Sequence, residues 1–339
     1  MVIDAHAREK LHGNAPRRNQ CILDNTSGPQ HYRSHMAQSL NTSPRPVAFI
    51  TGASSGIGAA ASSVFAAAGY DVVLAARRLE RLERAAAEAR AACPAARVVP
   101  VVCDVTSDLA VRNAFRTMEE QFGRLDVLIN NAGFGVYGSV AQTPLASFRA
   151  SMETNFFGAL RCTQAALPLL RRAAQNPLAL PPPSSRGGAE TPGHSRGAKR
   201  ARWPGACIVM VSSIVGRRAF PLASAYCAGK FALEGLSEAL RVELYDQGIA
   251  VSVVNPGVVR SEFFDAAQGT RPAGFIPAQQ GMSPADVAQA LLQAARRPCR
   301  NRYLTWAGKG GIALQWLAPE VFDYLLIRAQ RTSEVKSEK

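Results

Sequence analysis

The stretch VAFITGASSGIG, residues 47–58, joins a short apolar run to an alanine-rich segment through three glycines. The run at 47–50 predicts a buried strand, and the alanine-rich segment predicts a helix. Gly52 would permit a tight turn, and Gly56 and Gly58 would let the backbone approach a pyrophosphate at the helix start. A tight turn that binds no ligand is the alternative. The cofactor-binding residues of this turn would be Gly52, Ser54, Ser55, Gly56, Ile57 and Gly58.

Strand-like and helix-like segments alternate along the chain after this turn. The strand-like segments are runs of Val, Ile and Leu, which are typical of strands that are buried on both faces of a parallel sheet. We therefore expect a single doubly wound, Rossmann-like α/β domain, with a mostly parallel sheet flanked by helices. The predicted strands are 47–50, 71–76, 97–105, 125–130, 206–211 and 249–255, and the predicted helices are 52–69, 78–92, 107–122, 144–174 and 224–247.

This domain is predicted to span residues 45–306. Residues 1–44 are polar and lack apolar periodicity, so we expect a disordered extension. We also hypothesise that Met36 is the native start, which a natural peptide from residues 1–35 would refute. Residues 175–205 are rich in Pro, Gly, Ser and Arg and predict a flexible inserted loop, while 307–339 predict a helical extension and tail.

The composition narrows the class of protein. The chain has 339 residues and a net charge of +14, which could indicate nucleic acid or an anionic membrane as a partner. The basic inserted loop carries almost no aromatic residues, so we expect a solvated segment and no nucleic-acid site. No apolar run reaches the roughly 20 residues of a membrane span. Seven scattered cysteines and the lack of a secretory signal predict reduced thiols, no metal site and a cytoplasmic protein.

The second predicted strand ends LAARR, with Ala76 followed by Arg77 and Arg78. In doubly wound folds, a carboxylate at this position accepts a hydrogen bond from the adenosine 2′-hydroxyl, whereas an arginine suits a 2′-phosphate. The sequence therefore predicts NADP (NADPH) as cofactor, with Arg77 as the main phosphate contact. A solvated arginine at a helix start is the alternative.

Further motifs occur in a fixed order along the chain. They are NNAG (130–133), Asn155 in METNFFG, Ser213 in VMVSSIVG, YCAGK (226–230) and NPGVVRS (255–261). Together with the glycine-rich turn, they resemble the short-chain dehydrogenase/reductase family over roughly residues 46–300. Ser261 stands where that family often has Thr, and Ser55 stands where some NADP-preferring members have a basic residue, which weakens the expected selectivity.

The resemblance implies a role for each matched residue. Tyr226 would be the general acid in carbonyl reduction or the base in alcohol oxidation, with its pKa lowered by the Lys230 ammonium. Ser213 would bind the substrate oxygen, and Asn155 would order a water for proton relay. Further cofactor contacts would come from Tyr226, Lys230, Asp104, Val105, Asn131, Ala132, Gly133, Pro256, Gly257, Val259 and Ser261.

The substrate side is predicted to be apolar, under a mobile lid at residues 258–282. Its wall would come from Phe134, Val136, Tyr137, Phe263, Phe264, Phe275 and Ile276. These aromatic residues favour a hydrophobic alcohol or ketone, although they could equally pack the lid shut. In the tail, apolar residues from Trp316 to Leu326 lie near helical spacing, broken by Pro319. They favour packing on the core or on another subunit over contact with a membrane.

The sequence thus predicts an NADP-dependent oxidoreductase that interconverts an alcohol and a carbonyl on a small hydrophobic substrate. The resemblance implies a homo-oligomer, dimeric or tetrameric. A regulatory protein that binds NADP without catalysis is one alternative, opposed by the complete set of four catalytic positions. A sugar-nucleotide epimerase or dehydratase is another, opposed by the glycine spacing and by the lack of a large C-terminal substrate domain.

Overall fold

A parallel sheet runs through the domain, so the carboxyl ends of all its strands lie along one edge. The computed structural model describes residues 45–178, 205–269 and 280–337. Within them the sheet has seven strands in the order β3-β2-β1-β4-β5-β6-β7, and every adjacent pair is parallel. The strands are β1 (Val47–Thr51), β2 (Asp71–Ala76), β3 (Val98–Val102), β4 (Val127–Asn130), β5 (Ala206–Val211), β6 (Ile249–Asn255) and β7 (Arg302–Tyr303).

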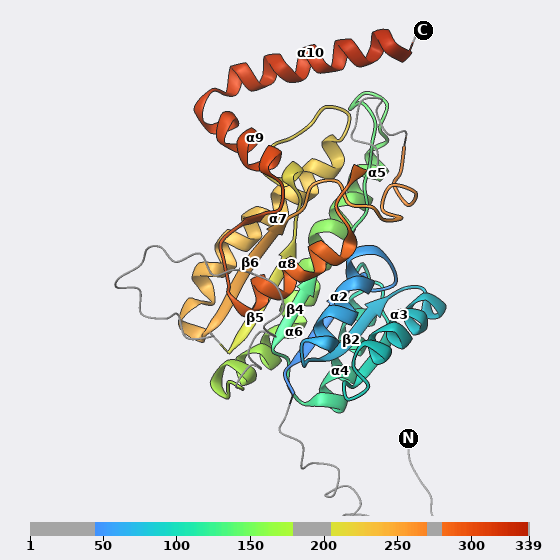
Figure 1. Cartoon of the computed structure of the whole chain (residues 1–339), viewed down its shortest axis with the longest axis vertical. Helices are drawn as coiled ribbons and strands as arrows, with labels where there is room; N and C mark the ends of the chain where they lie inside the picture. Colours follow the sequence, from blue (N-terminus) through green and yellow to red (C-terminus); the bar gives the residue numbers. More distant parts are fainter. Residues whose placement is uncertain (1–44, 179–204, 270–279, 338–339) are drawn as a thin grey trace, which may run out of the picture. The chain divides into compact units, whose positions relative to one another are not determined.

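Helices cover both faces of this sheet (Figure 1). The crossover helices are α2 (Gly56–Ala67), α3 (Leu79–Ala92), α4 (Asp108–Phe122), α5 (Leu145–Met152), α6 (Gly158–Gln175), α7 (Ser224–Glu243) and α8 (Pro284–Arg296). Single turns are η1 (Glu153–Phe157), η2 (Ile214–Gly216) and η3 (Tyr245–Gln247), and the chain continues through α9 (Trp306–Leu317) and α10 (Pro319–Ser337). The predicted doubly wound α/β fold is confirmed.

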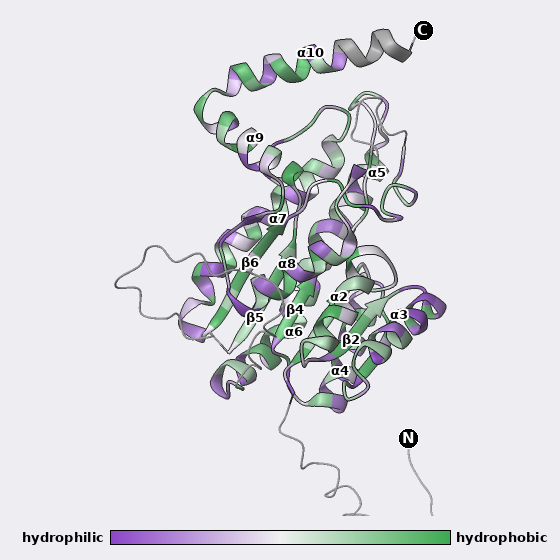
Figure 2. Cartoon of the chain, in the orientation of Figure 1, coloured by the Kyte–Doolittle hydropathy of each residue, from purple (hydrophilic) through white to green (hydrophobic). Residues whose placement is uncertain are grey.

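The core forms two layers because successive strand residues point to opposite faces of the sheet. Ile50 and Leu74 belong to one apolar cluster, which includes residues of α2, α3 and α8. Phe49 and Val73 belong to the other, which includes residues of α4, α6 and α7. Figure 2 shows the strands as hydrophobic and the outer side of helices such as α3 as hydrophilic. Burial on both faces explains the continuous apolar runs in the sequence.

The predicted elements match closely, apart from shifted ends, such as β3 ending at Val102 and α2 beginning at Gly56, and three larger differences. The helical region predicted at 144–174 is divided into α5 and α6 by the π-helical turn η1, and α6 extends to Gln175. The segment predicted as one helix at 224–247 ends as a helix at Glu243 and continues in the turn η3. Helix α8 and strand β7 were not predicted, since the sequence analysis assigned no element between 256 and 306.

Several predictions fall on residues that the structure does not describe. The extension at 1–44 and most of the inserted loop, residues 179–204, lie outside the described residues, as do Phe275 and Ile276. Strands β4 and β5, which precede and follow the insertion, pair directly with each other. The predicted break at Pro319 is confirmed, because α9 ends at Leu317 and α10 begins at Pro319. Among the described helices, none combines the length and apolarity needed to span a membrane.

Candidate active site

A cavity of about 950 Å³ opens at the carboxyl ends of the parallel strands. Strands β1 and β4 are neighbours here, and chain connections leave them in opposite directions along the sheet. This is the position where doubly wound sheets bind ligands. All the predicted catalytic and cofactor-binding residues line the cavity except Gly58 and Asn155, which lie behind its wall.

The glycine-rich turn between β1 and α2 is built for close backbone approach. Gly52 and Gly56 have left-handed φ angles of 66° and 55°, which disfavour residues with a Cβ atom. A Cβ atom on Gly58 would lie 2.4 Å from the carbonyl oxygen of Gly52. Ser55, which precedes α2, makes no capping bond through its side chain, and the first turn of α2 holds no acidic residue. The positive helix start is therefore left for an anion, which fits the pyrophosphate of a dinucleotide.

The arginines after β2 flank this turn. Both Arg77 and Arg78 line the cavity, and it is Arg78 that donates to the Oγ atoms of Ser54, at 3.3 Å, and Ser55, at 3.4 Å. Arg78 also lies 3.9 Å from the carboxylate of Glu262, which pairs with Arg81 as well. The sequence predicted Arg77 as the main phosphate contact and gave Arg78 and Glu262 no role in the site. Glu262 lies about 180 residues away in sequence, and no sequence motif indicated that it would lie near these arginines.

The ends of β3 and β4 complete the wall on the adenosine side. Asp104 and Val105 line the cavity, with the Asp104 carboxylate fixed by the backbone N–H and hydroxyl of Thr106 at 2.9 and 2.8 Å. The Asn131 amide donates to the carbonyl of Thr51 at 2.9 Å and so ties β4 to the glycine-rich turn. These contacts hold the predicted adenosine pocket rigid.

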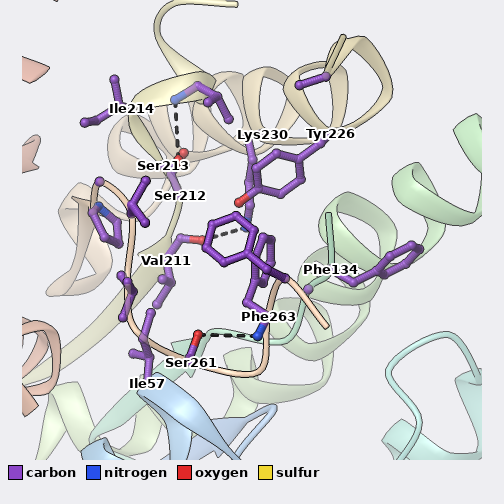
Figure 3. Close-up of a pocket in the computed structure, with 18 of the residues that line it drawn as sticks. Ile57, Phe134, Val211, Ser212, Ser213, Ile214, Tyr226, Lys230, Ser261 and Phe263 are labelled. Carbon is purple, nitrogen blue, oxygen red and sulfur yellow. Dashed lines mark hydrogen bonds between the residues drawn. The ribbon is translucent and has the colours of Figure 1, made fainter. Parts of the chain in front are cut away.

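The predicted catalytic side chains meet at the ends of β5 and α7. Figure 3 shows the side chains of Tyr226 and Lys230 projecting from α7 into the cavity, with Phe263 facing them. The Ser213 hydroxyl interacts with the Tyr226 phenol and accepts a hydrogen bond from the backbone N–H of Val215 at 3.4 Å. Lys230 donates to the carbonyl of Val211 at 2.9 Å, and its Nζ lies 5.8 Å from the centre of the Tyr226 ring.

Asn155 stands behind this group, within the π-helical turn η1. Its amide nitrogen donates to the carbonyl of Phe134 at 3.1 Å and to Ser151. Its Oδ1 is buried without a hydrogen-bond partner among the described residues. A Cβ atom on Gly133 would lie 2.4 Å from that oxygen, so only glycine fits between Asn155 and the cavity. The amide oxygen is therefore a free acceptor beside the cofactor wall.

The pKa of Tyr226 differs from the sequence-based expectation. Burial of the phenol raises its pKa well above the ordinary value, and the hydrogen bond from Ser213 opposes this only in part. Burial also lowers the pKa of Lys230 to about 8. The expectation that the ammonium lowers the phenol's pKa is wrong for this structure, because both groups lie almost out of water and burial is the largest cause of both pKa shifts.

The substrate side of the cavity is mainly apolar. Phe134, Tyr137, Phe263 and Phe264 line it as predicted, whereas Val136 is buried behind the wall. The Phe263 ring lies 5.5 Å from the Tyr226 ring. Further apolar residues that the sequence analysis missed come from the segment after η2 and from the C-terminal helices: Phe220, Pro221, Leu222, Ile312, Phe322 and Leu326.

Comparisons with known proteins agree with this geometry. The family model described as short chain dehydrogenase matches residues 46–176 and 201–271. The chain is 32% identical over 301 residues to dehydrogenase/reductase SDR family member 7B of Bos taurus, covering 86% of this chain and 83% of that protein. It is 31% identical over 288 residues to dehydrogenase/reductase SDR family protein 7-like of Anopheles gambiae, covering 83% and 81%.

Solved structures extend the comparison. An alcohol dehydrogenase from Thermococcus sibiricus complexed with 5-hydroxy-NADP matches with a TM-score of 0.60 and 25% identity, covering 76% of this chain and 94% of that one. A short chain dehydrogenase/reductase from Burkholderia phymatum in complex with NAD matches in fold, with a TM-score of 0.65 and 23% identity, covering 82% and 95%. On its motifs, its fold and these matches, the chain belongs to the short-chain dehydrogenase family.

Proposed function

We propose that the chain is an NADP-dependent oxidoreductase that interconverts an alcohol and a carbonyl by hydride transfer. Membership of the family supports oxidoreductase chemistry in general. The observation that carries the finer proposal is the meeting of the Tyr226 phenol, the Ser213 hydroxyl and the Lys230 ammonium in the cavity that also holds the glycine-rich turn. The phenol can donate a proton and the serine hydroxyl can donate a hydrogen bond to a substrate oxygen, and both lie beside the proposed dinucleotide-binding turn.

The residues divide the work between proton transfer and charge stabilisation. A nicotinamide cofactor, when bound, supplies or accepts the hydride. Tyr226 gives its phenolic proton to the substrate oxygen during carbonyl reduction, while Ser213 donates a hydrogen bond to the same oxygen. Lys230 then stabilises the phenolate that remains. Burial raises the pKa of the phenol, so the phenol carries its proton at neutral pH and can donate it in reduction, while the same group takes the proton back in oxidation.

A carbonyl and alcohol panel tests this function. Hydrophobic ketones, aldehydes and alcohols are offered with NADPH or NADP, and the absorbance of NADPH is followed for the wild type and for Tyr226→Phe. Turnover by the wild type alone supports the proposal. Tight binding of NADPH with no turnover of any compound would favour a regulatory, non-catalytic protein.

Preference for NADP rests on the two arginines after β2 and on the lack of an acid at Ala76. We expect Arg77→Ala to raise the KM for NADPH about 10- to 100-fold and the KM for NADH far less, because a hydrogen bond to a charged group contributes about 1.5–3 kcal/mol. Steady-state kinetics with both cofactors measure this. Arg84→Ala, on the exposed side of α3, is the control and should change neither value. Equal effects of Arg77→Ala on both cofactors would contradict the assignment.

The apolar wall supports a hydrophobic substrate, and we further propose a cytoplasmic homo-oligomer. The C-terminal helices carry exposed apolar side chains, among them Trp316 at 79% and Leu317 at 86% exposure. Apolar clusters of this kind mark interaction surfaces in soluble proteins. The acidic Glu320 and Asp323 lie among them, which favours another subunit over an anionic membrane.

We expect the double substitution Trp316→Ser/Leu317→Ser to lower the molecular mass of the assembly in solution, because it removes apolar area from the proposed contact. Light scattering after gel filtration measures the mass. The control is Val242→Ser/Tyr245→Ser, which removes equally exposed apolar side chains at the end of α7 and in η3. An unchanged mass together with lost flotation on liposomes would instead assign the surface to lipid.

A further inference from the structure

Glu234 is a buried carboxylate on the same side of α7 as the proposed catalytic pair. It follows Lys230 by one helical turn and Tyr226 by two, so the three side chains lie along one face of the helix. Its exposed fraction is 3%. A carboxylate is costly to bury unless several polar partners replace the lost water. Glu234 has no role in the reaction proposed above.

Its partners come from the segments that carry the site. Arg217, just after η2, lies 2.8 Å from Oε2, and the Ser212 side chain also stabilises the ionised carboxylate. The side-chain amide of Asn255, at the end of β6, makes its hydrogen bonds when its nitrogen faces Glu234. It then donates to Oε1 at 2.7 Å and to the carbonyl of Ser213 at 2.9 Å. The carboxylate therefore links α7, the end of β5 and the end of β6 at the depth of Ser213.

The two cations nearest Glu234, Arg217 and Lys230, differ in their carboxylate partners. On α7 it lies between Lys230 and Glu238, with Arg241 beyond, while Arg217 faces it from after η2. Near β7, Arg300 pairs with Glu238, and Tyr303 lies by Arg217. Arg217 also has a second partner, since Glu238 lies 2.9 Å away. Among the described residues, Glu234 is the carboxylate whose charge opposes the lowering of the Lys230 pKa by burial.

We propose that Glu234 is a positioning residue, which keeps Lys230 cationic and, through Asn255, holds Ser213 in place. The catalytic part of this inference rests on the proposed function. The electrostatic part concerns the unliganded chain alone, so it can be tested without turnover. The two carboxylates that share Arg217 provide a matched pair, because Glu238 is partly exposed and does not contact Ser212 or Asn255 in the described structure.

The first test compares the unfolding constants of wild type, Glu234→Gln and Glu238→Gln between about pH 6 and pH 9. In the wild type the Lys230 pKa is about 8 when folded and lies below its value of 10.5 in an unfolded chain, so the lysine's contribution to stability increases with pH above about 8. In Glu234→Gln the folded pKa falls further, so this increase begins at lower pH. The destabilisation by Glu234→Gln should therefore shrink with rising pH, about tenfold in unfolding constant for each unit of lowered pKa.

A destabilisation by Glu234→Gln that does not change with pH would overturn the proposal. Because burial also raises the pKa of the Glu234 carboxyl itself, a pH dependence that persists when Lys230 is replaced by Met would overturn it as well. Glu238→Gln should show no such dependence. If Glu234→Gln does not fold at neutral pH, the double variant Glu234→Gln/Lys230→Met decides. It recovers folding if the uncompensated lysine is the cause, and it stays unfolded if Glu234 serves only Arg217.

The second test uses the pH dependence of carbonyl reduction. If Lys230 must be cationic, kcat/KM in the wild type decreases as pH rises through about 8. In Glu234→Gln this decrease should occur at lower pH, whereas Glu238→Gln should follow the wild type. An unshifted profile would remove the catalytic part of the proposal. Lack of turnover in the wild type would refute the proposed function instead, while the unfolding experiment would still test the coupling.

Discussion

Replacing Tyr226 with Phe is expected to lower kcat for carbonyl reduction about 10²- to 10⁴-fold, the range attributed to a general acid. The substitution removes one oxygen atom and keeps the ring that packs near Phe263. The Ser213 hydroxyl loses its phenol partner but keeps the N–H of Val215. Because the ring and its surroundings persist, the dissociation constant for NADPH should change by less than about threefold, which corresponds to under 1 kcal/mol.

Three measurements separate catalysis from folding in this experiment: NADPH absorbance for kcat, quenching of protein fluorescence for the dissociation constant, and the thermal midpoint for stability. Tyr245→Phe is the matched control, since this tyrosine lies in η3 with 79% of its surface exposed. It should behave as the wild type in all three. Retention of most of the turnover by Tyr226→Phe would mean that another group donates the proton.

Much of the site could be predicted because it is assembled from strand ends. Each short motif follows a buried strand, and the carboxyl ends of parallel strands meet along one edge of a sheet. NNAG at the end of β4 and Ser213 after β5 therefore had to lie close to the glycine-rich turn after β1. The tyrosine and lysine of YCAGK share one face of α7 for the same local reason, namely their spacing.

The contacts in the site that the sequence did not predict join segments that lie far apart in the chain, and no local sequence pattern relates such segments. Arg78 approaches Ser54 and Ser55 because of how α3 begins against the turn, and Glu262 reaches the same arginine from a loop far along the chain. Phe322 enters the cavity from a helix after the predicted domain. Sequence spacing carries no information on such approaches.

The wrong expectation for the pKa of Tyr226 has a similar origin. The sequence places an ammonium beside a phenol, which by itself predicts a lowered phenol pKa. It does not show that both groups are buried. In the fold Tyr226 and Lys230 have exposed fractions of 8% and 4%, and desolvation becomes the larger effect. Burial is a property of the packed structure, so the electrostatics of the site follow only once the fold is known.

Replacing Gly58 with Ala is expected to weaken binding of NADPH about 100-fold or more and to destabilise the fold. The new Cβ atom would lie 2.4 Å from the Gly52 carbonyl oxygen, 2.8 Å from the Asn131 amide nitrogen and 2.9 Å from the Ala53 Cα. Two of these atoms belong to the backbone of the turn, so the turn itself must move. Overpacking of this kind costs about 1–3 kcal/mol of stability. Displacement of the helix start also removes N–H groups from the proposed pyrophosphate position.

Gly235→Ala is the matched control, because this glycine lies within α7 and a Cβ atom there would meet nothing within 4 Å. Alanine is favoured over glycine inside a helix by about 1 kcal/mol, so this variant should raise the thermal midpoint and leave cofactor binding unchanged. Calorimetry of the unliganded chains and titration with NADPH give the two quantities for each variant. If Gly58→Ala binds NADPH as tightly as the wild type, the start of α2 does not hold the pyrophosphate, and the cofactor must lie elsewhere along the strand ends.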